Sequence, residues 1–312
     1  MSRLWLREVS LTVSGSSGQL DLSGLKVEWN VVKTLGSKAN TATITVYNLT
    51  PSHRNALGDE FKQIELTHRY RGAGTTVLFR GQIRDKGTRK GVRRAGEDGP
   101  GGGGTNQGTK TTQETADVKT VIECGDGDEG VNKGAVSKTF KKGSKPKELV
   151  EHLVKEMPGV RMGQMVGLDD LPAFKRPVSL YGWSFRELDT LGRQFGFYWS
   201  IQNGEFQALK ADQALPGPIV LSSSTGMLGI PEVTDKGVKV RALPIAGLDR
   251  AGAIIDVRSD FLDEGSGRDK RASDAGGGLF RVASLQYQGS NRDNDNHVDI
   301  EANRMSGKRV TK

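Results

Sequence analysis

Apolar and polar residues alternate along several short segments in the first third of the chain. In residues 25–31, Leu25, Val27, Trp29 and Val31 occupy every second position. A period of two is that of a strand with one buried face. The same pattern predicts strands at residues 43–47, 61–70, 76–83 and 118–123. Several short strands of this kind favour a small β-barrel.

One brief helix is predicted among these strands. Thr50 suits the N-cap, and Pro51 suits the first helical position, where no amide donor is needed. Gly58 ends the pattern.

The period changes in the middle of the chain. Residues 149–157 carry apolar side chains at helical spacing after Ser144, and Pro158-Gly159 ends that helix. A second helix is predicted to begin at Ser184, where residues 184–187 have the pattern of a capping box, and to end at Gly196.

A tight hairpin follows the second helix. Asn203-Gly204 separates two short strand patterns, residues 197–202 and 205–209, and Asn-Gly favours a two-residue turn. Helices and a hairpin together predict an α+β domain in this section.

Strand patterns return from about residue 219 to the end. The alternation slips by one residue between Phe280-Val282 and Leu285-Tyr287, which predicts a β-bulge near Ala283-Ser284. Residues 291–296 predict a polar turn, and Val298 begins the last strand.

Residues 87–117 interrupt the strands of the first third. They contain few apolar side chains and an unbroken glycine run at residues 101–104. So little apolar area cannot offset the entropy of ordering the segment. We therefore predict a long hairpin insertion in the first barrel.

Four basic residues lie near the start of this insertion, and we interpret them as an arm that contacts an acidic partner. A surface insertion without a partner is the alternative. The candidate contact residues are Arg89, Lys90, Arg93 and Arg94.

The length of the chain and its net charge bear on the number of domains and on whether the protein binds nucleic acid. The chain has 312 residues, enough for two or three domains, and a net charge of +8. A basic chain suggests nucleic acid, but residues 80–94, where the cations gather, contain no aromatic residue that could stack on bases. No specific nucleic-acid binding is expected.

The single cysteine, Cys124, excludes an intrachain disulfide and is expected to be a half-buried strand residue. No apolar stretch is long enough to span a bilayer, and residues 1–11 lack the apolar core of a signal peptide. We therefore expect a protein that is neither secreted nor inserted in a membrane.

No pattern of side chains predicts catalysis. The four histidines are scattered without metal-ligand spacing, and residues 126–130 begin like a calcium loop but lack the later ligands, so a turn is favoured there. Nucleophile-elbow and phosphate-loop motifs are missing from the sequence. Aromatic residues between Tyr181 and Trp199 are interpreted as core packing around Phe185, Phe195 and Trp199. We predict no catalytic residue, no metal and no cofactor.

Four segments resemble, in order, those of phage tail baseplate hub proteins related to the late control protein D family. Residues 38–57 resemble a strand, Asn-Leu and short-helix signature, and residues 79–83 followed by 118–140 resemble the next strands. Residues 179–209 resemble a helix and hairpin, and residues 223–258, with a Gly-Ile-Pro-Glu turn, resemble the last barrel. Residues 87–117 have no counterpart.

The resemblance implies the phage tail-hub fold: mainly β, with two small β-barrels flanking an α+β domain. The expected domains are a first barrel at residues 1–140 with the insertion at 87–117, an α+β domain at 141–214, and a second barrel with a basic tail at 215–312.

The resemblance also implies a structural role in the virion, with assembly in the host cytoplasm. The hub would be a homotrimeric ring that adapts a six-fold tail tube to a three-fold central spike or needle, with baseplate wedge and tape-measure proteins as further partners. Alternatives are a hub-like component of a contractile injection or type VI secretion-like spike, and a basic nucleic-acid-binding protein.

Overall fold

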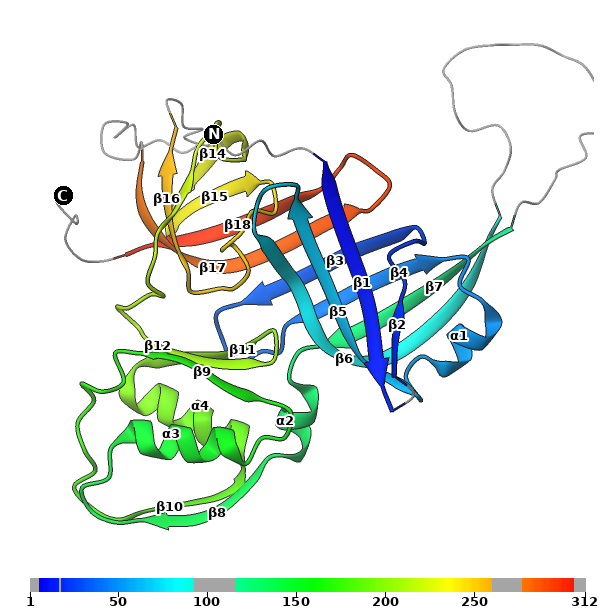
Figure 1. Ribbon diagram of the computed structural model, residues 1–312. Coiled ribbons are helices and arrows are strands. Elements are labelled where there is room, and N and C mark those ends of the chain that lie inside the picture. Colours follow the sequence, from blue (N-terminus) through cyan, green and yellow to red (C-terminus); the bar gives the residue numbers. More distant parts are fainter. Residues whose placement is uncertain (1–5, 17, 93–115, 260–276, 306–312) are drawn as a thin grey trace, which may run out of the picture.

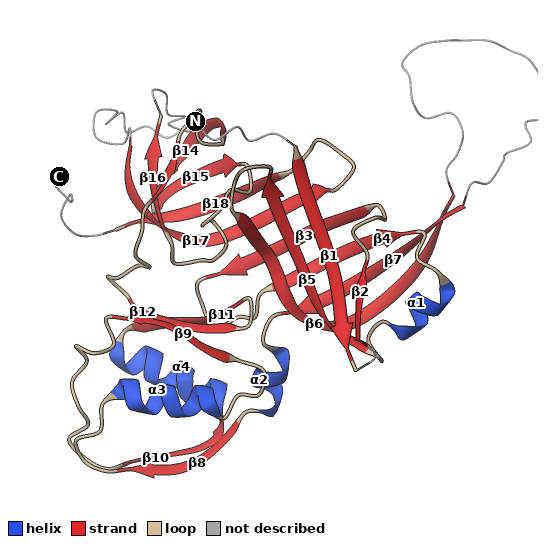
Figure 2. Cartoon of the chain, in the orientation of Figure 1, coloured by secondary structure: helices blue, strands red, loops and turns tan. Residues whose placement is uncertain are grey.

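The computed structural model describes residues 6–16, 18–92, 116–259 and 277–305, and this part of the chain is mainly β (Figures 1 and 2). Strands form both ends of the described chain, and two longer helices lie in the middle section. The predicted fold class, mainly β with an α+β middle section, is confirmed. Among the described helices, none has the length and apolar character needed to cross a membrane.

The first β region contains seven strands and one short helix. They are β1 (Arg7–Gly15), β2 (Gly18–Asp21), β3 (Val27–Thr34), β4 (Thr41–Tyr47), α1 (Pro51–Ala56), β5 (Phe61–Tyr70), β6 (Thr75–Val92) and β7 (Ala116–Gly125). The predicted alternation determines the core: Val27, Trp29 and Val31 of β3 are buried, and the residues between them are more exposed.

The middle region packs two helices between two small sheets (Figure 1). Its elements are α2 (Asp128–Lys133), β8 (Ala135–Phe140), α3 (Pro146–Lys155), β9 (Arg161–Val166), β10 (Val178–Trp183), α4 (Ser184–Phe195), β11 (Phe197–Gln202) and β12 (Glu205–Lys210). Strands β11, β12 and β9 form one sheet, and β10 and β8 form the other. Apolar residues of both sheets and both long helices form a core separate from that of the β regions.

The second β region contains six strands. They are β13 (Ile219–Leu221), β14 (Met227–Thr234), β15 (Gly237–Ala242), β16 (Ile254–Arg258), β17 (Gly277–Ser290) and β18 (His297–Arg304). Its buried residues belong to the same apolar core as those of the first β region.

The two β regions share one 13-stranded sheet, which corrects the prediction of two barrels. The sheet is continuous because β17 is long: its N-terminal part pairs with β16, and Ser284–Ser290 pairs with Glu28–Thr34 in β3. The sheet does not close into a barrel on either side of this junction: β14 and β13 are open ends of the second β region, and β2 is the open end of the first.

Both β regions have the same strand order. Across the sheet, the first reads β3-β4-β7-β6-β5-β1 and the second reads β14-β15-β18-β17-β16-β13. We number the six strands of each region 1 to 6 in chain order and leave out β2, which only extends the sheet beyond β1. Both regions then have the strand order 2-3-6-5-4-1 across the sheet. The final pair differs in direction, since β1 is antiparallel to β5 and β13 is parallel to β16.

Several local predictions are confirmed. Helix α1 has Thr50 as N-cap, whose hydroxyl accepts from the His53 amide, and Gly196 ends α4 in the left-handed conformation. Asn203 and Gly204 both have positive φ, at 57° and 79°, as the predicted two-residue turn requires. The β-bulge lies between Val282 and Ser284, as predicted.

Other local predictions are wrong. Ser184 does not cap α4: Trp183 is the N-cap, and the buried Ser184 hydroxyl has no hydrogen-bond partner. The predicted turn at residues 126–130 runs into helix α2, which begins after Gly127 in the left-handed conformation. Local sequence favoured a turn there because two glycines weaken the helical signal.

The two ends of the predicted insertion belong to strands: residues 87–92 are part of β6, and residues 116–117 are part of β7. Strand β6 continues to Val92, paired with β7 from Gln82↔Gly125 to Val92↔Ala116. The strand continues because the β7 backbone supplies its hydrogen bonds, although the segment has few apolar side chains. The rest of the predicted insertion, residues 93–115, lies outside the described residues.

A buried histidine makes the first β region sensitive to acid. His68 on β5 has no exposed surface, neither ring nitrogen has a partner, and its ring meets Tyr70 edge-on at 4.9 Å. Burial lowers the pKa of His68 from 6.5 to about 4, with a smaller contribution from the charge of Arg7.

We predict that His68→Leu makes the protein less sensitive to acid. The unfolded chain takes up a proton at His68 near pH 6.5 and the folded chain only near pH 4, so native stability falls as pH drops through this window. The loss from this residue is about 3 kcal/mol. Urea unfolding from pH 7 to 4 should show a smaller loss in the variant than in the native protein. Parallel stability curves for the two proteins would contradict the prediction.

Candidate functional site

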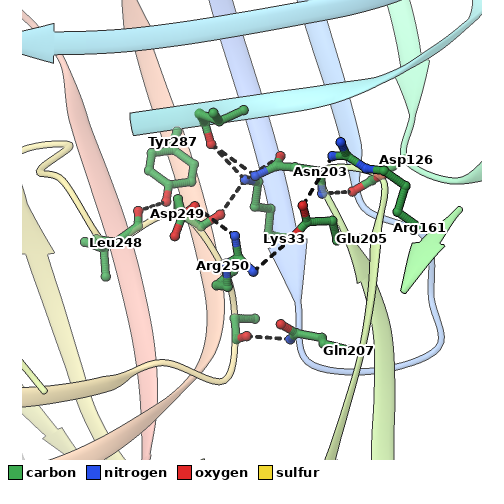
Figure 3. Close-up of polar contacts among 12 residues, drawn as sticks. Lys33, Asp126, Arg161, Asn203, Glu205, Gln207, Leu248, Asp249, Arg250 and Tyr287 are labelled. Atoms are coloured by element: carbon green, nitrogen blue, oxygen red, sulfur yellow. Dashed lines mark hydrogen bonds and ion pairs between the residues drawn. The ribbon is translucent and has the colours of Figure 1, made fainter. Parts of the chain in front are cut away.

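Polar residues from all three regions, most of them buried, meet in one cluster (Figure 3). Lys33 comes from β3, Asp126 follows β7, Asn203 lies in the β11–β12 turn, and Asp249 lies in the loop between β15 and β16. Segments far apart in the sequence therefore depend on one hydrogen-bonded cluster, which we call the central polar junction.

Lys33 is the centre of this junction. Its Nζ donates to the Asn203 side-chain oxygen at 2.9 Å, to the Asp249 carbonyl at 2.6 Å and to the Val77 carbonyl at 3.2 Å. The side chain has no exposed surface. Burial lowers the pKa of Lys33 from 10.5 to about 8, against the opposing effect of the Asp249 and Asp126 charges.

Asp126 holds the tip of the β11–β12 hairpin. Its carboxylate accepts from the Asn203 amide at 2.6 Å and from the Gly204 amide at 2.8 Å. Burial raises the pKa of Asp126 to about 6, although these hydrogen bonds and Lys33 act to lower it. The positive φ angles of the Asn-Gly turn direct two successive amides at one carboxylate.

Further hydrogen bonds extend the junction toward the second β region. Glu205 pairs with Arg250 at 3.4 Å and with Arg161 at 3.2 Å, and the Gln207 side chain donates to the Ala251 carbonyl at 2.7 Å. The buried Tyr287 hydroxyl of β17 donates to the Leu248 carbonyl.

The junction also binds the middle region to the first β region. The Asn40 side chain donates to the Ile201 carbonyl at 2.7 Å, and the Gln202 side chain donates to the Thr34 carbonyl at 2.9 Å. Because Lys33 and Asp126 have no exposed surface, no substrate reaches them in this conformation. The arrangement fixes how the three regions sit against one another.

Sequence reasoning did not select the junction, although one signal was present. Lys33 continues the buried positions of β3, after Val27, Trp29 and Val31. A lysine at a buried position of an alternating strand implies acceptors from elsewhere in the fold. The partners themselves could not be predicted, because Asn203 and Asp249 lie far away in sequence.

The aromatic residues of the middle region divide into two groups. Trp199 belongs to the core, with Phe185 and Phe195 packed against it, which confirms their interpretation as core residues. Tyr181 and Trp183 on β10 are instead exposed, at 81% and 42%. Their strand alternates, so every second residue faces away from α3 and α4.

A groove of about 590 Å³ lies beside the start of β11. The half-exposed Tyr198 lines it, with the Arg281 guanidinium 5.4 Å from the centre of its ring. Asp189 also lines it and accepts from the Trp199 indole at 2.9 Å. The described lining of the groove also includes Arg193, Phe197 and Trp199, beside glycine and small apolar residues, and this set does not define a reaction.

The predicted contact residues fall at the edge of the described structure. Arg89 and Lys90 lie in β6, opposite Lys119 and Val118 of β7. Arg93 and Arg94 lie outside the described residues. Cys124 is buried rather than half-buried, and burial raises the pKa of its thiol to about 12, so it is an unreactive core residue.

The fold is that of phage tail proteins. The chain is similar over 96% of its length to the 43 kDa tail protein of prophage MuSo2 from Shewanella oneidensis, covering 97% of that protein at 10% identity and a TM-score of 0.57. It is similar over 96% to a tail protein from Neisseria meningitidis MC58, covering 97% of it at 9% identity and a TM-score of 0.58.

A secretion protein has the same fold. The chain is similar over 97% of its length to an E. coli component of the type VI secretion system that exhibits structural similarity to the T4 tail proteins gp27 and gp5. It covers 77% of that protein at 12% identity, with a TM-score of 0.52. No protein-family model matches the sequence, and no curated protein sequence matches it. The resemblance to the tail-hub fold is thus confirmed at the level of fold.

We predict that Lys33→Met destabilises the whole protein. The substitution keeps the length of the side chain but leaves three buried or partly buried acceptors without their charged donor, at a cost of about 3 kcal/mol. Chemical denaturation measures this loss. The control is Lys141→Met at an exposed position, which should change stability by less than about 0.5 kcal/mol. Equal effects of the two substitutions would contradict the assigned role of Lys33.

The same variant should change the alkaline stability profile. With a folded pKa of about 8, Lys33 loses its proton before the unfolded chain does, at 10.5, so native stability rises with pH above about 8. Denaturation curves of native protein between pH 8 and pH 10 should show this rise, and Lys33→Met should lack it. A rise of equal size in both proteins would mean that another group is responsible.

Proposed function

We propose that this chain is a structural subunit of a phage tail: the baseplate hub, a trimeric ring that adapts a six-fold tail tube to a three-fold central spike. The proposed partners are a tail tube protein, a spike or needle protein, and baseplate wedge or tape-measure proteins. The hub would assemble in the host cytoplasm and remain in the virion tail.

The repeated strand order of the two β regions carries this proposal. A chain with two β units of the same topology, joined in one sheet, presents six such units when three copies form a ring. On one face of the ring, six similar units can contact a six-fold tail tube. On the other face, the ring has only three-fold symmetry and can contact a three-fold spike. The fold shared with tail proteins agrees with this use.

A hub-like component of a contractile injection or type VI secretion-like spike is the second candidate. It is favoured by the likeness to the E. coli secretion component. The two candidates differ in the particle that contains the protein. Mass spectrometry of purified virions and of secretion sheaths from the same cells distinguishes them.

We further propose that the protein has no catalytic activity. The polar groups with the most perturbed surroundings, Lys33 and Asp126, are fully buried and occupied by hydrogen bonds. Purified protein should leave bacterial cell wall intact on a zymogram. Clearing of the cell wall by the protein would contradict this proposal.

We predict that the protein forms trimers, alone or with its tube or spike partner. Each contact should bury on the order of 1,600 Å², the size of a specific stable interface. Light scattering of the purified protein, and of its complex with the spike, measures the number of copies. Two or six copies in the assembled particle would contradict the hub proposal.

We also propose that Arg89, Lys90, Arg93 and Arg94 contact an acidic neighbouring subunit. Changing all four to Glu should weaken assembly, most visibly at low salt, where charge attraction is least screened. The control changes Lys141, Lys142, Lys175 and Arg176, which are exposed on the middle region, to Glu. Sedimentation of reconstituted assemblies compares the variants, and an equal loss in both would show a general charge effect.

A further inference from the structure

The junction inside one chain shows how two of these β units pair. Strand β17, the fifth strand of the second β region, pairs with β16 as far as Arg281. A bulge follows between Val282 and Ser284. From Ser284 to Ser290 the strand then pairs with β3, the second strand of the first β region. The fifth strand thus leaves its own region at a bulge and joins the next one.

Strand β6, the fifth strand of the first β region, is built in the same way. It pairs with β5 as far as Gln82, and a bulge in its pairing with β7 follows between Ile83 and Asp85. From Asp85 to Val92 it pairs with β7 on one side, and the described strands supply no partner on the other. Asp85, Gly87 and Thr88 are exposed.

The two fifth strands also share a second feature, a side-chain hydrogen bond to the connection between the third and fourth strands. In the second β region, the Tyr287 hydroxyl of β17 donates to the Leu248 carbonyl in the connection between the third and fourth strands. In the first, Lys86 Nζ of β6 donates to the Asn55 carbonyl at 2.6 Å and to the Leu57 carbonyl, in the corresponding connection. In both regions this connection is tied to the fifth strand just beyond the bulge.

The complementary edge is β14, the second strand of the second β region and thus the counterpart of β3. It pairs with β15 on one side and, within the described part of the chain, with no strand on the other. Leu228 and Ile230 on this strand are exposed, at 37% and 60%. An edge strand with exposed apolar side chains is a site where another strand can add.

We propose that residues 85–91 of β6 in one copy pair with β14 of a second copy, as β17 pairs with β3 inside the chain. The inference rests on the proposed trimer and identifies the strands that would join its copies. By analogy with Ser284↔Thr34, Asp85 lies opposite Thr234 of the neighbouring copy and Gly87 lies opposite Glu232. In a ring of three copies, β17–β3 junctions within copies then alternate with β6–β14 junctions between copies. The ring closes when each of these six junctions rotates one β region relative to the next by about 60°.

The irregularity of β14 favours a specific pairing over uncontrolled edge association. The bulge of β14 between Leu228 and Glu232 includes a proline, which cannot donate to an added strand. In the proposed register Thr88 lies opposite this proline, so regular pairing is expected at residues 85–87, opposite 232–234, and is interrupted beyond them.

Cysteine cross-linking between two variants tests the pairing. Gly87→Cys is tolerated because no atom lies within 4 Å of the added Cβ, and Glu232 is exposed. Opposed residues of antiparallel strands lie about 4.5–5.5 Å apart, within disulfide range. Under mild oxidation, a mixture of Gly87→Cys and Glu232→Cys proteins should form covalent dimers containing one of each. The native Cys124 is buried and does not compete.

The matched control mixes Gly87→Cys with Gln19→Cys, which lies exposed on β2 at the other end of the sheet. The first mixture should give at least about tenfold more cross-linked dimer, because pairing raises the local thiol concentration. Equal yields, or no dimer in the first mixture, overturn the inference. Light scattering on the same samples separates the two claims. With the spike partner present, three copies without the 87–232 cross-link contradict the strand pairing alone, whereas two or six copies contradict the hub proposal.

Discussion

Lys33 places an ammonium group at the centre of the molecule, out of contact with water. A buried charge without partners costs more than the net stability of most proteins, so its three acceptors have to remain in place. They come from β6, from the β11–β12 turn and from the β15–β16 loop, so each region supplies one of them. The relative orientation of the three regions therefore depends on this one group, and Asp126 strengthens the constraint by holding the same turn through two amides.

This constraint has a consequence for assembly. With the three regions held in one orientation, β17 can leave its own region and complete the edge of β3. The chain then contains one complete junction between β units, and in the described residues β14 and the end of β6 each have one edge without a strand partner. Under our proposal these two edges pair between copies in the same way, and the copies then form a ring.

The sequence predicted those elements that are determined by residues close together in the chain. Strand β5 has the predicted bounds, and the Asn203-Gly204 hairpin and the bulge after Val282 also lie where they were expected. The length of β6 could not be predicted in this way, because its glycines, threonines and cations are held by the β7 backbone. Helix α2 was missed because its sequence begins with glycine and turn-forming residues.

Long-range pairing was beyond sequence reasoning. The junction of β17 with β3 joins residues about 250 positions apart, and no local pattern specifies such a partner. The acceptors of Lys33 are equally distant, so the central polar junction appears only when the chain is folded. The tail-hub fold was expected instead from the resemblance to tail hub proteins, and solved tail proteins share the fold of this chain.

An electron cryomicroscopy map of the assembled protein, with its tube or spike partner, tests the central claim most directly. The account predicts three copies in a closed ring of six β units, in which β17–β3 pairing within each copy alternates with β6–β14 pairing between copies. A ring of another copy number, or an assembly in which the two β regions occupy unrelated positions around the axis, would contradict it.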